Sequence, residues 1–587
     1  MPRRLFVFHS RVWLVVGLLA LGSAAHAQRG GGRGGRGGGA SGAGADTTRG
    51  FVITDATTRT NCQSCHRRDS LGMLQRISFE RKTPEGWEMT VRRMVALNNV
   101  KLDPVAARQI VRYLSDNQGL APAELRPGRF EVERRMIEYR YTADPRTETT
   151  CRACHSMGRV ITQRRTRGEW ELLVATHRAL FPDVDFQAFR RGGRASNDSG
   201  PAQQPMDIAI NHLARAFPLR TPEWTAWSAT MRPPHLEGTW SLSGNQPGRG
   251  AFYGHLTVTR GASDGEFVTQ ATYRYADDGK IVQRTGKSIV YTGYQWRGRS
   301  SEPSGRGADT TSLREVMFVE PGWKEMSGRW FNGGYDEIGM DVSLEKLGAN
   351  PVLAGVAPHA LHVGTRGQDV TIFGANLPRN IAANAIDFGP GVSVQQVVRA
   401  TPDSIMVRVN VDPSAAVGKR DLYAAGASLR DGAVVFNQIS YIKVVPLAGL
   451  ARVGGVVFPK QFQQFDAIAY YNGPDGKADT GDDLEIGRVN ASWTLEEYAV
   501  TYDDDDVKFV GTINQSGLFT PNLDGPNPQR SANRDNVGDV WVVATYSPPG
   551  SPLGTPAGTP ARPLRARAQL IVTVPLYVKF VQWNTQP

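Results

Sequence analysis

The pattern of apolar and polar positions changes along this chain and divides it into regions. An apolar run, Val12–Leu21, stands near the start. In residues 51–235, apolar side chains recur four and seven residues apart, which is the spacing of amphipathic helices. From residue 236 onward, apolar and polar residues alternate in short segments separated by Gly, Asp or Pro, as in antiparallel strands. The pattern predicts a multidomain protein in which an all-α domain is followed by all-β domains.

Residues 1–27 have the features of a cleaved secretory signal peptide. Arginines precede the apolar run, and the small-x-small sequence Ala25-His-Ala27 follows it. The run is about half as long as the ~20 apolar residues of a membrane-spanning helix, so export is favoured over an N-terminal anchor. No later stretch is long and apolar enough to span a bilayer. We therefore expect a periplasmic protein without a membrane span.

Residues 28–50 are dominated by Gly and Arg and predict a disordered tether. A tract of this kind can bind RNA. Behind an export signal, however, a disordered leader is the simpler interpretation, and we expect no nucleic-acid partner.

Three β domains are expected in the second part of the chain. Residues 236–349 alternate with period two and predict a barrel or sandwich, which we assign as a β-barrel domain. Residues 350–445 contain short strands at sandwich spacing and resemble immunoglobulin-like domains. Residues 446–587 predict a C-terminal β-sandwich domain. Its strands are expected near residues 465–471, 507–512, 539–546 and 567–581.

The β domains contain no recognisable catalytic motif, and we assign no catalytic residue to the chain. The acidic loop 475–483 has carboxylates at calcium-like intervals but lacks the bidentate Glu of an EF-hand, so a solvated turn is favoured over a calcium site. The run Asp503–Asp506 is expected to be the charged tip of a hairpin.

Composition adds that the chain of 587 residues is long enough for about four domains. The formal net charge is +12, and the positive excess lies mainly in residues 51–235, whereas residues 236–587 are slightly acidic. The helical domain therefore contains a group that brings its own negative charge, or it meets an acidic partner.

All four cysteines fall in two copies of one motif. Cys62-Gln-Ser-Cys65-His66 and Cys151-Arg-Ala-Cys154-His155 are both C-x-x-C-H, the attachment sequence of c-type haem. The two thiols bind the vinyl groups of one porphyrin, and the His becomes the proximal iron ligand. A four-Cys zinc site and a thioredoxin-like pair are the alternatives, but neither needs His after each second Cys. Two covalently bound haem c groups are expected, and their propionates would offset the positive charge.

An internal repeat predicts the sixth ligands of the two irons. Met94 and His177 each stand seven residues after a tryptophan, Trp87 and Trp170 respectively. Seven residues are nearly two helical turns, so each pair shares one helix face. The position between them on that face is filled by Val91 and Val174. Residues 51–235 therefore predict a duplicated cytochrome c unit with an attachment helix, a ligand helix and a closing helix in each half.

Other residues compete for these positions. Met73 and Met89 compete with Met94 at the first haem, and Met157 and His212 compete with His177 at the second. A methionine on a helix is also more often a core residue than an iron ligand. If Met94 and His177 are the ligands, the first haem has the higher potential and the second the lower, which describes an electron relay.

With these motifs and this domain order, the chain resembles the α subunit of quinohemoprotein amine dehydrogenase. The resemblance covers residue 51 to the C-terminus and includes the stretch 82–94 between the haem motifs. It implies a heterotrimer with a propeller β subunit and a small γ subunit that carries cysteine tryptophylquinone. It further implies that electrons from primary amines pass through the two haems to a soluble cytochrome c or a cupredoxin.

Two other classes of function stay open at this point. One is an autonomous dihaem electron-transfer protein or a cytochrome c peroxidase, whose reactive haem needs an open distal side. The other is a binding module whose β domains hold a polymer or a surface. The sequence gives neither the amine specificity nor the haem that lies nearer the quinone.

Overall fold

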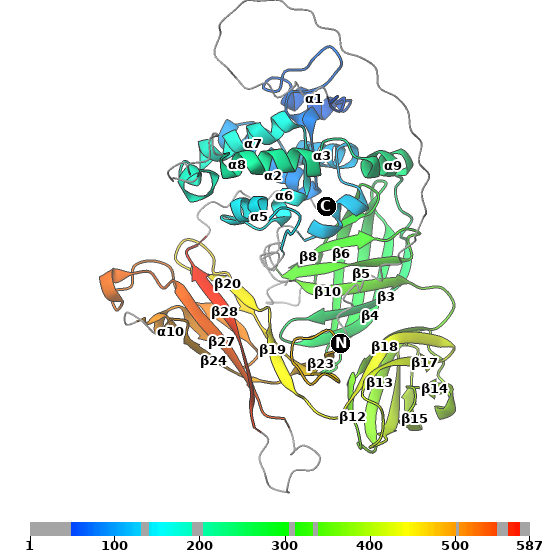
Figure 1. Cartoon of the computed structure of the whole chain (residues 1–587). Helices are drawn as coiled ribbons and strands as arrows, with labels where there is room; N and C mark the ends of the chain where they lie inside the picture. The colour runs from blue at the N-terminus through cyan, green and yellow to red at the C-terminus, as the bar shows by residue number, and fades with distance from the viewer. Residues whose placement is uncertain are drawn as a thin grey trace, which may run out of the picture.

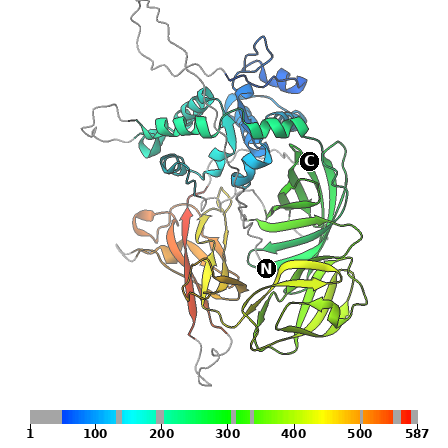
Figure 2. The ribbon, with the colours of Figure 1, turned by 45° about the vertical axis from the view of Figure 1, so that its right-hand side comes forward.

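The structure, a computed structural model, describes residues 48–130, 140–190, 203–303, 312–332, 339–499, 504–548 and 562–575. The signal peptide 1–27 and residues 28–47 of the expected tether lie outside these ranges. A helical domain covers one end of a β-barrel, a third domain lies at the other end, and the last domain lies beside the barrel (Figure 1). A second view shows the same arrangement, with the last domain beside the barrel and below the helices (Figure 2).

The helical domain consists of two halves with the same element order. Each half has an attachment helix, a ligand helix and a closing helix: α1 (Ala56–Cys62), α2 (Pro84–Asn98) and α3 (Pro104–Asn117), then α5 (Pro145–Arg152), α7 (Arg167–Leu180) and α8 (Pro205–Ala216). Most of the helix starts follow from the sequence, because a Thr or Asp caps the first turn of every one of these helices except α8, and Pro often follows the cap. Thr83 accepts a hydrogen bond from the Gly86 backbone, and Thr166 accepts one from Glu169 at the equivalent place.

A short antiparallel ladder joins the two halves. Strand β1 (Glu80–Lys82) precedes α2, strand β2 (Gln163–Arg165) precedes α7, and the two strands pair with each other. Arg81 lies opposite Arg164 at the centre of this ladder. Both guanidinium groups bind the buried carboxylate of Glu124, which is part of the short helix α4 (Pro122–Leu125). The ligand helices therefore start from one shared, rigid element.

Each half has its own hydrophobic core. Trp87 and Val91 of α2 are buried in the first core, which Cys62 also contacts. Trp170 and Val174 of α7 take the same places in the second core. The apolar stripes of the two ligand helices are thus used in the same way, which agrees with the internal repeat.

Residues 238–346 form a closed barrel of eight antiparallel strands, in which each strand pairs with the next and β10 closes against β3. Its strands are β3 (Gly238–Gln246), β4 (Gly250–Arg260), β5 (Glu266–Tyr275), β6 (Ile281–Tyr291), β7 (Gln295–Ser301), β8 (Ser312–Val319), β9 (Glu325–Asn332) and β10 (Met340–Lys346). Aromatic side chains such as Phe252, Trp296 and Trp330 fill the interior. The barrel is therefore a packed support and not an open channel.

Polar contacts fix the barrel to the first half of the helical domain. Arg297 of β7 forms a buried ion pair with Glu85 in the first turn of α2. The Thr292 backbone N–H donates to Asp116 of α3 at 2.7 Å, and burial raises the pKa of Asp116 to about 6. Because these contacts reach α2 and α3 directly, the barrel holds the first ligand helix in place.

The third domain is a sandwich of two four-stranded sheets, ordered β11-β13-β16-β15 and β12-β18-β17-β14. Its strands are β11 (Val352–Ala357), β12 (Ala360–His362), β13 (Gln368–Ala375), β14 (Ile386–Asp387), β15 (Val392–Ala400), β16 (Ser404–Val411), β17 (Gly418–Ala424) and β18 (Ala427–Phe436). Valine and isoleucine side chains from both sheets form its core.

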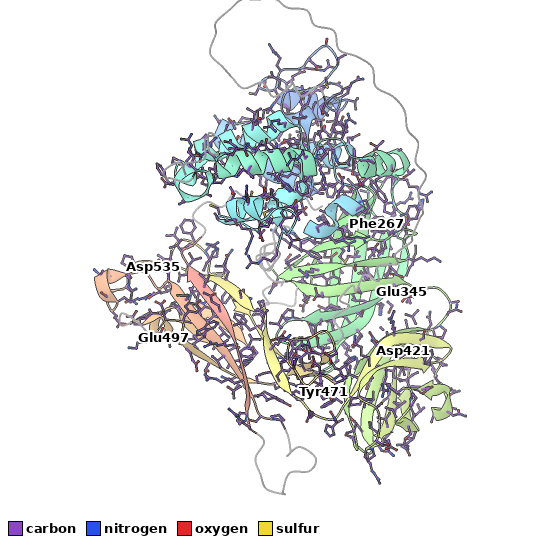
Figure 3. All side chains as sticks on the ribbon, in the orientation of Figure 1. Phe267, Glu345, Asp421, Tyr471, Glu497 and Asp535 are labelled. Carbon is purple, nitrogen blue, oxygen red and sulfur yellow. The ribbon has the colours of Figure 1, made fainter. Side chains whose placement is uncertain are left out.

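The last domain contains three sheets around one core, ordered β19-β22-β23, β20-β28-β27-β24 and β21-β26-β25. Its elements are β19 (Tyr441–Val445), β20 (Ala448–Arg452), β21 (Gln463–Gln464), β22 (Asp466–Tyr471), β23 (Leu484–Val489), β24 (Ser492–Glu497), α10 (Asp506–Phe509), β25 (Gly511–Ile513), β26 (Leu518–Pro521), β27 (Gly538–Tyr546) and β28 (Leu564–Thr573). Figure 3 shows the side chains on the ribbon and labels residues of the β domains, from Phe267 and Glu345 on the barrel to Asp535 on the last domain.

Two expectations for this domain were wrong. In the segment 507–512, residues 507–509 belong to the helix α10 and residues 511–512 begin β25. Asp506 is not at a solvated hairpin tip, because it is buried and forms an ion pair with the fully buried Arg530. Asp503 and residues 576–581 lie outside the described residues. The predicted fold class, an all-α domain followed by all-β domains, is confirmed. Within the described ranges, no helix combines the length and the apolar character needed to cross a membrane.

Candidate functional site

The two C-x-x-C-H motifs lie at the ends of attachment helices. Helix α1 ends at Cys62, and the His66 backbone N–H donates to the Cys62 carbonyl at 2.9 Å, which turns the chain back on itself. Cys151 lies in the last turn of α5. In both motifs the first cysteine is partly buried and the second is exposed. This arrangement places a thiol on each side of the turn that leads to the histidine.

None of the four cysteines forms a disulfide. Burial, assisted by the charge of Asp55, raises the pKa of Cys62 to about 11, and burial raises the pKa of Cys151 to about 12. The two pairs contact different hydrophobic cores. Among the described residues, the four cysteines form no common cluster of metal-ligating groups. These facts do not favour the four-Cys zinc site.

The second motif places its histidine against the histidine of the ligand helix α7. The ring centroids of His155 and His177 are 6.4 Å apart, with an interplanar angle of 43°. A metal–imidazole bond is about 2 Å long, so the centroids of two imidazoles on opposite sides of one metal ion are about 6 Å apart. The observed separation of 6.4 Å is close to this value, so the two rings have room for one metal ion between them.

Hydrogen bonds to backbone carbonyls orient the rings of both His155 and His177. His155 Nδ1 lies 2.9 Å from the Ser156 carbonyl, and His177 Nδ1 lies 2.8 Å from the Leu173 carbonyl one turn earlier in α7. Nδ1 must therefore carry the proton, which leaves the Nε2 lone pair for a metal. Burial lowers the pKa of His155, and this favours the neutral form that a metal requires.

The first motif shows the same orientation of its histidine. His66 Nδ1 lies 2.9 Å from the Gln75 carbonyl, so its Nε2 is also available. Met94 lies on α2 in line with the buried Trp87 and Val91, and it is half-buried where they are fully buried. Its sulfur is 3.6 Å from the amide nitrogen of Asn98. A half-buried thioether at the end of a buried stripe suits a ligand that a porphyrin would cover.

The competing ligands are used in other ways. Both ring nitrogens of His212 have partners, since Nε2 lies 2.7 Å from the Tyr141 hydroxyl and Nδ1 lies 3.5 Å from an Asp144 oxygen. Met157 is fully buried in the second core. Met73 is buried as well, and the Met89 sulfur accepts from Arg159 at 3.8 Å. The two contacts of His212 favour His177 over His212 at the second site, while Met94 stays the prediction of the internal repeat for the first site.

A large cavity contains the second site. It has a volume of about 1780 Å³ and is lined by Cys151, Cys154, His155 and His177. The walls also come from α2, from the barrel and from the loop before β21. Apolar side chains at its helical wall, among them Leu180 and Phe181, are exposed to this space. A cavity of this size, with apolar walls and a pair of facing imidazoles, is able to hold a porphyrin.

Buried charges surround the ladder between the two sites. Burial opposes ionisation of Glu124, but the guanidinium groups of Arg81 and Arg164 outweigh it and lower the pKa of Glu124 to about 2. Glu80 is held ionised in a similar way by Arg165 and Lys82, whereas burial lowers the pKa of Lys82 to about 7. The sequence did not reveal this network, because three-residue strands rich in charged side chains look like solvent-exposed segments.

The acidic residues of the loop 475–483 and of the run 504–506 make contacts within the last domain. In the loop 475–483, Asp482 and Asp483 accept hydrogen bonds from Thr480 and Tyr441, and Asp479 pairs with Lys443. Asp504, Asp505 and Asp506 come close together, and the buried Arg530 forms ion pairs with Asp505 and Asp506. Neither group is needed to explain the haem sites.

Comparison with known proteins points to one family. Four family models match the chain, all of the α subunit of quinohemoprotein amine dehydrogenase: the haem-binding domain at residues 52–224, domain II at 233–347, domain III at 349–437 and domain IV at 442–586. No curated protein matches the chain. A solved structure of the full plexin A4 extracellular region is 6% identical over 58% of this chain and 61% of that chain, so less than two thirds of plexin A4 is covered. Its TM-score of 0.12 is too low to support any argument.

Proposed function

Because the chain belongs to the family of quinohemoprotein amine dehydrogenase α subunits, we propose that it is the haem-bearing relay and scaffold subunit of a periplasmic amine dehydrogenase. In this proposal a small partner subunit with a quinone cofactor oxidises primary amines to aldehydes. The electrons then pass through two c-type haems on this chain to a soluble cytochrome c or a cupredoxin. A propeller subunit completes the complex.

The single observation that carries the proposal is the facing pair His155 and His177. Their centroid separation of 6.4 Å and their backbone-bound Nδ1 atoms suit two axial ligands of one haem iron. Cys151 and Cys154 would bind this haem covalently, and Cys62 and Cys65 would bind the other. His66 and Met94 would be the axial ligands of the first iron.

The haems would supply one-electron chemistry, which neither the helices nor the β domains of this chain can provide. The residues of the chain would fix the positions and the potentials of the two haems. The Gln75, Ser156 and Leu173 carbonyls keep the histidine rings in one orientation. Met94 would raise the potential of the first site because a thioether favours Fe(II), whereas His177 would lower that of the second.

The competing functions need different features. A peroxidase requires an open distal position, but His177 would fill that position at the second site. A binding module would not need two histidine rings at an axial separation. Amine oxidation is proposed to occur on the partner subunit, so the proposal needs no acid–base residue on this chain.

The test uses the complete complex purified from periplasm. Addition of a primary amine without oxygen should reduce both haems, and quinone redox staining should mark a small co-purifying subunit. The chain is expressed together with its neighbouring genes for this test. The proposal is wrong if the chain then purifies alone, and amine does not reduce its two haems.

A further inference from the structure

Helix α2 presents two different faces to the two candidate haem sites. Trp87, Val91 and Met94 form one stripe, which is directed toward the first site. Met89 and Arg93 lie on another side of the helix and line the cavity of the second site. At 100° per residue, these two stripes are roughly 150° apart around the helix. The helix is therefore a wall between the two sites.

A cluster of buried charges lies at the base of this wall. We call it the cation cluster, and its members are Arg76, Glu80, Lys82, Arg93, Arg165 and Glu169. Its ion pairs are Lys82–Glu80 at 2.9 Å, Arg76–Glu169 at 2.9 Å, Arg165–Glu169 at 3.8 Å and the closer contact Arg165–Glu80. Lys82 and Arg165 are almost completely buried, with 4% and 2% exposure.

The cation cluster has more positive than negative charge. Its four basic side chains face two carboxylates, and because the pKa of Lys82 is about 7, the excess of positive charge at neutral pH is between one and two. Arg93 is largely buried and lies in the field of the Glu80 carboxylate and of the cations Arg165 and Arg76, and among the described residues it forms no ion pair. Uncompensated buried charge is costly, so such an excess indicates an anion that the chain itself does not provide.

The position of the cavity indicates where this anion would bind. Lys82, Arg93 and Arg165 all line the cavity that contains the second haem motif. The carboxylates of the cavity wall outside the cluster are already engaged, because Glu85 pairs with Arg297, Glu88 with Arg92 and Glu302 with Arg284. The positive excess is therefore directed toward whatever occupies the cavity.

We infer that Lys82, Arg93 and Arg165 bind the two propionates of the second haem. The propionate carboxylates supply negative charge where the cation cluster lacks it, and Arg groups bind carboxylates with strong, charge-assisted hydrogen bonds. The inference rests on the proposed function, since it requires a haem at Cys151, Cys154 and His155.

The arrangement gives α2 a role at both haems. Met94 would bind the iron of the first haem, and the adjacent Arg93 would hold a carboxylate of the second. These adjacent residues of α2 would thus link the two haems, Met94 through its bond to the first iron and Arg93 through its ion pair with a propionate of the second haem. Arg93 is a positioning residue in this scheme and also sets the potential of the second haem, because a nearby cation disfavours Fe(III).

The test is a potentiometric titration of the full chain loaded with haem. Electron paramagnetic resonance would follow the bis-imidazole iron separately from the thioether-ligated iron. We expect Arg93→Gln and Lys82→Met each to lower the midpoint potential of the bis-imidazole haem. We also expect its potential to become more dependent on pH, because a released propionate titrates. Arg93→Lys should restore most of the wild-type value.

Arg108→Gln is the matched control, since Arg108 is an exposed arginine on α3 of the same domain, and it should change neither potential. The inference is overturned if both test variants leave the bis-imidazole potential unchanged, or if only the thioether-ligated haem responds. Haem content is measured first: a chain without two haems refutes the proposed function, whereas two haems with unchanged potentials refute only the present inference.

Discussion

Glu124 is the residue on which the two halves of the helical domain depend most directly. Its carboxylate accepts hydrogen bonds from Arg81 at 2.8 and 2.9 Å and from Arg164 at 3.1 Å. The side chains of Arg81 and Arg164 are only 0% and 6% exposed. Glu124→Gln therefore removes the counter-ion of two buried guanidinium groups without changing the size of the side chain.

The size of the effect follows from the pKa of this carboxyl group. The two arginines lower it from 4.5 to about 2 against the opposing effect of burial. A shift of this size corresponds to about 3 kcal/mol of folding free energy. Loss of one partner of a buried ion pair costs about 3–5 kcal/mol in other proteins. We therefore expect Glu124→Gln to destabilise the helical domain by about 3 kcal/mol at pH 7.

The pH dependence has a definite sign. The pKa is lower in the folded state, so the carboxylate stabilises the fold above about pH 4.5, and this contribution is lost as the pH falls toward 2. The assay is denaturant unfolding of the whole chain, with haem absorbance as the probe of the helical domain. Wild type and Glu124→Gln should differ at pH 7 and converge at low pH.

The control is Glu171→Gln, because Glu171 is 52% exposed and its ion pair with Arg167 is on the surface. This variant should change stability by less than about 0.5 kcal/mol. The reasoning is refuted if Glu124→Gln is as stable as wild type at pH 7, or if the loss of stability is the same at pH 7 and pH 2.5.

The other predictions concern the ligands and the last domain. His177→Ala should abolish the bis-imidazole signal of the second haem in paramagnetic resonance and raise its potential, whereas an unchanged oxidised spectrum would favour the peroxidase alternative. Met94→Leu should remove the near-infrared absorption of a thioether-ligated ferric haem. The control is Met157→Leu in the second core, which should leave that absorption intact and lower the free energy of unfolding by less than about 1.5 kcal/mol. Asp506→Ala should destabilise the last domain by about 3–5 kcal/mol, because Arg530 is fully buried against it, while Asp475→Ala in an exposed loop should have little effect in the same unfolding assay.

The sequence was most informative where the signal was local. The C-x-x-C-H motifs and the Trp-to-ligand spacing of seven residues depend only on neighbours along the chain, so the two halves and their helices could be predicted. Alternation likewise predicted strands in residues 236–349. Closure of β10 against β3, which pairs Lys346 with Trp240, could not be predicted, because it depends on contacts between residues far apart in the sequence.

Buried charge was the main feature that the sequence concealed. Arg81 and Arg164 stand in short charged segments that would normally face solvent, and only the position of Glu124 between them explains their burial. Asp506 was assigned to a hairpin tip for the same reason, since its partner Arg530 is 24 residues away. Both cases show that the partner of a charged residue decides whether that residue is exposed or buried.

The central claim is that this chain carries two covalently bound haems with different axial ligands. The most direct measurement is the intact mass of the purified chain together with its pyridine haemochrome spectrum, for wild type and for variants with one cysteine pair changed to alanine. We predict two haems in wild type and one in each variant. A wild-type chain with fewer than two haems, or a variant that keeps both, would contradict the claim.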